Sequence, residues 1–172
     1  MKSAKQRKKA ATKEELKVAR ALGGRRTFNS GAGEFEKGDG LVDGLFAIEN
    51  KTTDSDSYRL SGKDYQKIYE HARGKGLEPL FIVNMALIAN TSLTGRVVVI
   101  RAGYARVLGV YSPATEAPTA TALLRASHIL EDQEHGDGFD LLGHGKARFE
   151  LCWLSWELFL KARAREEEGT DE

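Results

Sequence analysis

Apolar residues recur along the chain with two different periods, and the order of those periods predicts a mixed α/β fold. Apolar side chains three or four positions apart predict helices at residues 13–22, 62–74 and 156–168. Short apolar runs predict strands at residues 79–89, 97–100 and 148–154, the first two of them covered on both faces. A strand, a helix and a strand in this order fit a crossover connection. We therefore expect a mixed central sheet flanked by helices.

The clearest local prediction is a β-hairpin. Leu41 and Val42 would form a short first arm, Asp43-Gly44 a favoured two-residue turn, and residues 45–51 the returning arm. Alternation along the returning strand should place positions 49 and 51 on one face of it.

Other segments give weaker patterns. Residues 53–61 are polar, and we interpret them as a connector whose last residue, Ser61, caps the helix that follows. Residues 104–111 are predicted as a strand and residues 120–130 as a short helix. Both belong to the region 101–146, which could be an insertion or part of a subunit interface.

Length and composition fit one ordinary globular domain. The chain has 172 residues, of which 41% are hydrophobic and 30% charged. We expect a flexible basic arm at residues 1–12 and a single domain at residues 13–168. The single cysteine, Cys152, lies in an apolar run and is expected in the core. No apolar stretch reaches transmembrane length and no secretory leader is visible, so an intracellular, cytoplasmic protein is expected.

Charge is distributed unevenly along the chain. The net charge is only +1, but basic residues gather before residue 27 and acidic residues after residue 165. Such polarity is typical of a protein with one side that faces a polyanion. The basic arm would add salt-dependent affinity for DNA, although a solvated terminus explains it equally well.

The hairpin also brings chemistry together. Folding its first arm back would place Asp39 beside Glu49, with Lys51 on the same face as Glu49. Carboxylate oxygens are the ligands that Mg²⁺ prefers, and Mn²⁺ is expected to substitute. The ion can activate a water and neutralise charge on a phosphate, while Lys51 can orient that water or stabilise the oxyanion. The arrangement suits phosphodiester hydrolysis.

Gly38-Asp39 followed by Glu49-Asn50-Lys51 resembles the motif of the PD-(D/E)xK nuclease superfamily. Within the superfamily, the chain is most similar to the archaeal-type Holliday junction resolvases and their phage relatives, over about residues 13–85. The resemblance implies a restriction-endonuclease-like fold. Asn50 departs from the pattern, because that position usually points into an apolar core. Its side chain needs a buried hydrogen-bonding partner, or else that side of the sheet is less sealed than usual.

The resemblance also implies roles for residues outside the hairpin. A glutamate on the first helix reaches the metal site in the resembling resolvases; Glu15 matches it best, and Glu14 is the rival. Ser30 matches a loop serine near the scissile phosphate, with Arg25 and Arg26 as contacts to the DNA backbone beside it.

Two lysines on the second predicted helix complete the candidate surface. Lys63 and Lys67 lie four positions apart on one helix face, so both could contact phosphates, although such lysines are often only solvated.

The hairpin chemistry predicts a Mg²⁺-dependent nuclease, and the resemblance further implies a structure-selective DNA endonuclease that resolves four-way (Holliday) junctions. Cutting two symmetry-related strands requires two active sites, so a homodimer is expected. The expected metal ligands are Glu15, Asp39 and Glu49, and Lys51 completes the catalytic set. One alternative is another restriction-like, repair or recombination nuclease of the superfamily. A second is a non-catalytic DNA-binding module, against which carboxylates facing phosphate argue. The sequence has the general look of a phage or prokaryotic protein.

Overall fold

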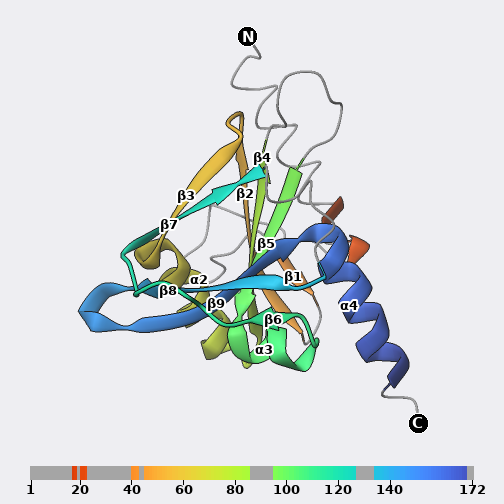
Figure 1. Cartoon of the computed structure of the whole chain (residues 1–172). Helices are drawn as coiled ribbons and strands as arrows, with labels where there is room; N and C mark the ends of the chain where they lie inside the picture. Colours follow the sequence, from red (N-terminus) through yellow and green to blue (C-terminus); the bar gives the residue numbers. More distant parts are fainter. Residues whose placement is uncertain are drawn as a thin grey trace, which may run out of the picture.

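The strands of this protein form a mixed central sheet flanked by helices, as the apolar pattern predicts (Figure 1). In the computed structural model, the described residues are 17–18, 20–22, 40–42 (backbone only), 45–85, 95–126 and 134–169. The predicted arm at residues 1–12 lies outside these ranges. Within them, no helix has both the length and the apolar character needed to cross a membrane.

Seven strands within the described residues make up the central sheet, in the order β1-β2-β4-β5-β9-β8-β6. Their bounds are β1 (Gly40–Val42), β2 (Phe46–Thr53), β4 (Glu78–Met85), β5 (Gly95–Arg101), β6 (Tyr111–Ser112), β8 (Gly136–Leu142) and β9 (Arg148–Ser155). The β2–β4 and β6–β8 pairs are parallel, and the other neighbouring pairs are antiparallel. The predicted crossover is confirmed, since β2 and β4 pair in parallel with a helix between them in sequence.

Two further strands form a separate antiparallel pair, β3 (Ser57–Ser61) with β7 (Thr121–Arg125), which we call the β3–β7 ribbon. Figure 1 shows β3 in yellow and β7 in teal, side by side next to the central sheet.

The helices are α2 (Gly62–Gly74), α3 (Ala102–Val107) and α4 (Trp156–Gly169), and a short 3₁₀ turn spans His144–Lys146. Helix α2 begins where predicted, because the side chain of Ser61 accepts a hydrogen bond from the backbone N–H of Asp64. Helix α4 begins in the same way, with Ser155 Oγ accepting from the backbone N–H of Leu158 at 3.2 Å.

Two hydrophobic cores lie on opposite faces of the sheet. On one face, α2 and the β3–β7 ribbon bury Tyr65, Leu60 and Leu124 against strand residues such as Phe81. On the other face, α3 and α4 pack over Phe46, Ile48 and their neighbours, and Val18 and Leu22 of the N-terminal helical segment join them. Odd-numbered positions of β2 therefore face α2, and even-numbered positions face α4.

Several expectations of buried core are confirmed. Val18 and Leu22 are buried on the helical stripe predicted for residues 13–22. Cys152 is fully buried, and Trp153, Trp156 and Phe159 are all buried within the chain. Strand β4 is buried on both faces, as its mostly apolar run without alternation indicates.

Three local predictions are wrong. The supposed connector at residues 53–61 contains β3, whose inward positions Tyr58 and Leu60 pack on the core. Residues 104–111 do not form one strand, because α3 turns Ala102 and Ala105 inward with helical spacing, Gly109 adopts a φ of 70° just after it, and β6 begins only at Tyr111. Residues 121–125, predicted as helix, form β7 because a partner strand is available in space.

Candidate active site

The hairpin predicted to carry the site is formed, but its connection is one residue longer than the predicted two-residue turn, because Leu45 lies before the returning strand. Strands β1 and β2 are antiparallel, with Gly40 opposite Ile48 and Val42 opposite Phe46. The predicted turn residues Asp43 and Gly44 lie outside the described residues. The returning arm is therefore held on one side by β1 and on the other by the parallel strand β4.

Glu49 and Lys51 lie on the same face of β2 and form an ion pair. Their side chains are 24% and 41% exposed, so solvent and ligands can reach both. Because β2 pairs with β4 at both positions, opposite Phe81 and Val83, these two groups are presented from a hydrogen-bonded backbone. The predicted shared face is confirmed, whereas the catalytic roles remain predictions.

The remaining residues predicted at the metal or beside the scissile phosphate lie outside the described residues; they are Glu15, Arg25, Arg26, Ser30 and Asp39. Over the described ranges, no group of three or more His, Cys, Asp or Glu side chains is placed to hold a metal ion. Glu49 is therefore the predicted metal ligand whose surroundings can be described.

Asn50 has the buried partner that its position between Glu49 and Lys51 requires. Asn84 on β4 is only 5% exposed, and its Nδ2 donates to Asn50 Oδ1 at 2.7 Å and to the backbone oxygen of Lys51 at 3.2 Å. One amide thus binds both the side chain of Asn50 and the backbone of Lys51. Asn50 is therefore accommodated by a hydrogen bond to Asn84, and not by exposure of that face of the sheet to solvent.

Arg96 on β5 fixes the orientation of this amide. Its Nε donates to Asn84 Oδ1 at 2.7 Å, and its guanidinium lies 5.0 Å from the centre of the Trp156 ring. Because arginine can only donate, the oxygen of Asn84 must face Arg96 and its NH₂ group must face Asn50. Contacts from Trp156 through Arg96 and Asn84 to Asn50 therefore connect α4 to β2 on the sheet face opposite Lys51.

Tyr58 and Asp64 border the Glu49–Lys51 pair on its exposed face. Burial raises the pKa of the Tyr58 hydroxyl; the positive charge of Lys51 opposes this shift, while Asp64 and Glu49 add to it. The hydrogen bond from Ser61 Oγ at 2.7 Å lowers the pKa of the Asp64 carboxyl, and Lys67 and Lys51 lower it further. All four groups thus act on one another electrostatically around Lys51.

Lys63 and Lys67 are both exposed on α2, as predicted, one helical turn apart. Lys67 Nζ lies 3.2 Å from Asp64 Oδ1, so part of its charge is already compensated. A phosphate would have to share Lys67 with this carboxylate.

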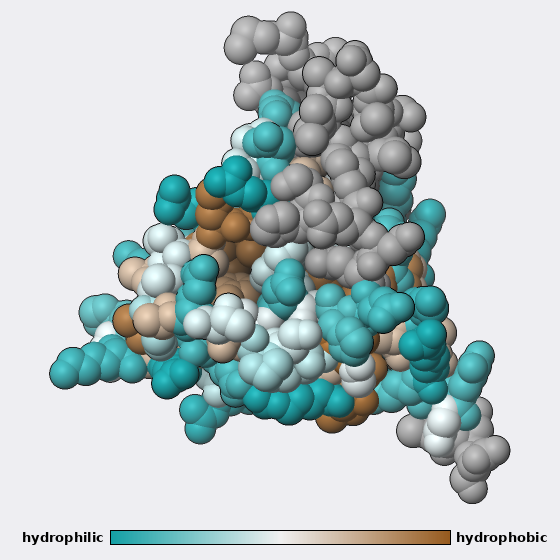
Figure 2. Space-filling model, viewed as in Figure 1, coloured by the Kyte–Doolittle hydropathy of each residue, from teal (hydrophilic) through white to brown (hydrophobic). Residues whose placement is uncertain are grey.

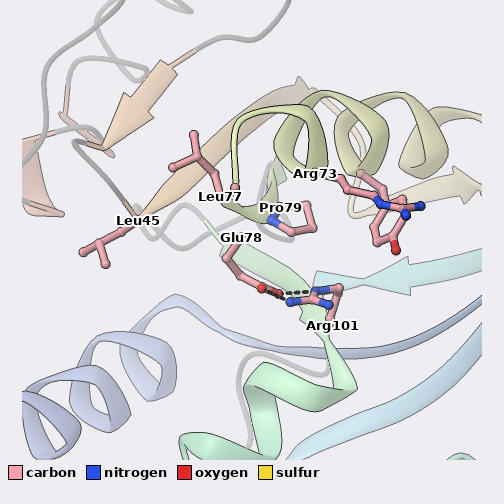
Figure 3. A pocket seen from close by; sticks show the side chains of 8 residues that line it. Leu45, Arg73, Leu77, Glu78, Pro79 and Arg101 are labelled. Atoms are coloured by element: carbon pink, nitrogen blue, oxygen red, sulfur yellow. Dashed lines mark hydrogen bonds and ion pairs between the residues drawn. The ribbon is translucent and has the colours of Figure 1, made fainter.

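A pocket of about 480 Å³ lies at the opposite end of the same strands (Figure 3). Arg101 binds Glu78 with two hydrogen bonds across it, one of them 2.7 Å from Nε to Oε1, while Leu45, Leu77 and Pro79 supply apolar walls. Glu78 begins β4, whereas Lys51 is aligned with Val83 near the other end of that strand. The pocket is therefore separate from the Glu49–Lys51 pair.

Sequence reasoning missed Tyr58, Asp64 and Asn84. Tyr58 and Leu60 alternate with polar residues, which is a strand signal within the supposed connector. Asn84 is a polar residue inside an otherwise apolar run, and its strand was expected to follow the hairpin in a crossover. Two isolated polar residues on neighbouring buried strands are a signal for mutual hydrogen bonding.

No match to this chain was found among protein-family models, curated proteins or solved structures.

Proposed function

We propose that this protein is a Mg²⁺-dependent endonuclease that hydrolyses phosphodiester bonds in branched DNA, with four-way junctions as the preferred substrate. The observation that carries the proposal is the Glu49–Lys51 pair, held on one face of a strand that lies between a hairpin partner and a parallel neighbour. The strand–helix–strand unit behind this hairpin is also the arrangement that resemblance to PD-(D/E)xK nucleases implies.

The residues present fit a hard divalent cation. Glu49 offers carboxylate oxygens that are partly exposed, and oxygen donors are what Mg²⁺ requires. Gly40 is opposite Ile48, so continuing the ladder by one residue would place Asp39 opposite Glu49. Asp39, Glu49 and Glu15 would hold the ion. When bound, it would supply an activated water and neutralise charge on the phosphate.

The other groups have complementary tasks. The ammonium of Lys51 would stabilise negative charge on the phosphate oxygens or orient the attacking water. Asn84 fixes the backbone of Lys51, so the lysine is presented from a rigid strand. Ser30, Arg25 and Arg26 would bind the DNA backbone nearby, and a homodimer would supply the second active site that symmetric cleavage needs.

The test compares cleavage of an immobile four-way junction with cleavage of linear duplex, flap and single-stranded DNA, each with Mg²⁺ and with Mn²⁺. We expect preferential cleavage of the junction. Lys51→Ala and Asp39→Asn should each reduce the cleavage rate by about 100-fold or more while junction binding persists. Lys75→Ala is the matched control, because Lys75 is an exposed lysine beyond the far end of α2.

Each result has a distinct meaning. Normal cleavage by Asp39→Asn would refute the site assignment. Equal cleavage of junction and linear duplex would refute junction selectivity and favour another nuclease of the same chemistry. If no DNA is cut with either ion, the protein is not a nuclease of this kind.

A further inference from the structure

The β3–β7 ribbon has two chemically different faces. Leu60 and Leu124 point inward and are buried in the core shared with α2. Arg59 and Arg125 are exposed, at the alternate positions that point away from this core. Strand alternation therefore places both arginines on one outward face.

The outward face carries two positive charges, and one acid adjoins it, Asp64, which accepts a hydrogen bond from Ser61 Oγ. Its six positions are Ser57, Arg59, Ser61, Thr121, Leu123 and Arg125. Arg59 Nη1 lies 3.5 Å from Thr121 Oγ1, and among the described residues neither arginine forms an ion pair. Asp54 and Asp56 precede β3 and lie outside the paired positions of the ribbon. Leu123 on this face is 39% exposed, and Figure 2 shows a mainly hydrophilic described surface interrupted by apolar patches.

The ribbon also adjoins the candidate active site. The ring of Tyr58 lies 6.1 Å from the ring of Phe81, measured between centroids, and Phe81 is paired with Glu49 across β2 and β4. Tyr58 thus lies on the same sheet face as the Glu49–Lys51 pair. The ribbon therefore packs on the sheet beside these two residues, and its arginines lie on the ribbon face that points away from the sheet.

We propose that the outward face of the β3–β7 ribbon binds the DNA backbone, with Arg59 and Arg125 contacting phosphates of the segment that leads away from Glu49 and Lys51. The inference rests on the proposed function for the identity of the polyanion. Guanidinium groups bind phosphate oxygens through two N–H donors, and Ser57 and Thr121 add hydroxyls of the kind that contact DNA backbones. The contact reads no bases, so it suits an enzyme selective for DNA shape.

The magnitude of the effect follows from counterion release. Each phosphate contact contributes about 0.9 to the slope of log affinity against log salt concentration, so two contacts contribute about 1.8. If the two contacts add nothing to affinity at 1 M salt, this slope means that they strengthen DNA binding by about 30-fold at 0.15 M salt.

The experiment measures binding of the full chain to a fluorescent four-way junction and to linear duplex across a series of NaCl concentrations. The variant is Arg59→Gln combined with Arg125→Gln. The matched control is Lys161→Gln combined with Arg165→Gln, two exposed cations on α4, which covers the opposite sheet face. Thermal unfolding of all proteins establishes that the fold is intact, and cleavage is measured at saturating DNA.

We expect the ribbon variant to bind DNA about 30-fold more weakly, with a slope of log affinity against log salt that is smaller by about 1.8. Its cleavage rate at saturating DNA should be unchanged. The control pair should bind and cleave like wild type. If wild type cuts junctions but the ribbon variant binds like the control pair, the ribbon inference is overturned and the proposed function stands. If wild type binds without cutting and the ribbon variant loses binding, the proposed function fails and the ribbon surface stands. Absence of any DNA binding by wild type overturns both.

Discussion

Asn84 donates a 2.7 Å hydrogen bond to the side-chain oxygen of Asn50, and this bond joins β4 to β2 directly behind the Glu49–Lys51 pair. Asn84 is buried and Asn50 is partly buried, and the Asn84 amide donates to Asn50 while its oxygen accepts from Arg96. Their contact explains how a polar residue is tolerated between the acid and the lysine of the motif.

Replacing Asn84 with alanine should therefore lower the free energy of unfolding by about 2 kcal/mol, because buried polar groups lose their partner. Urea denaturation provides the measurement. The double variant Asn50→Val with Asn84→Val should cost less than the sum of its single variants, since both polar partners are then removed together. A change below about 0.5 kcal/mol for Asn84→Ala would show that the bond contributes little.

Gly62 is required by a close approach between α2 and the end of β8. A Cβ added there would lie 2.1 Å from the backbone oxygen of Leu142, whereas one added at Gly74 would meet nothing within 4 Å. Gly62→Ala should destabilise the protein by about 1–3 kcal/mol. Gly74→Ala, at the other end of the same helix, should be stabilising by up to about 1 kcal/mol, because alanine restricts the unfolded chain. Calorimetric unfolding would contradict this account if both variants shifted the midpoint in the same direction.

Asp64 should make stability depend on acid pH. Its folded pKa is lowered from 3.8, chiefly by the hydrogen bond from Ser61, so the charged carboxylate is favoured in the folded state. A lowered folded pKa gives stability that is present above the unfolded pKa and is lost as pH falls through the folded value. Asp64→Asn should be less stable than wild type at pH 7, and the difference should shrink below pH 3.8. Urea denaturation at several pH values checks this, and a difference independent of pH would contradict it.

Cys152 should be chemically silent in the folded protein. Its thiol is fully buried in the core between the sheet and helices α3 and α4, and burial raises its pKa to about 12. Because the thiolate is the reactive form, a disulfide reagent at pH 8 should modify the native chain only as fast as it unfolds, and denatured chain at once. Counting modified thiols in native and urea-unfolded samples provides the measurement. Rapid labelling without urea would show that the strand containing Cys152 opens locally.

Local sequence patterns were sufficient for the elements whose stability depends on near neighbours. Helix α2 could be predicted from its Ser61 cap and its stripe of Tyr65, Ile68 and Ala72, because these interactions lie within a few residues of one another. The arms of the hairpin and the shared face of Glu49 and Lys51 followed from strand alternation.

Tertiary structure alone decided the elements whose partners are distant in sequence. Arg59 and Thr121 meet in the β3–β7 ribbon although 62 positions separate them, and residues 121–125 became a strand because β3 offered a pairing edge. Asn84 reaches Asn50 only because β4 lies parallel to β2. Strand pairing and buried hydrogen bonds are contacts between segments that are distant in sequence. A pattern read over a few neighbouring residues therefore cannot predict them.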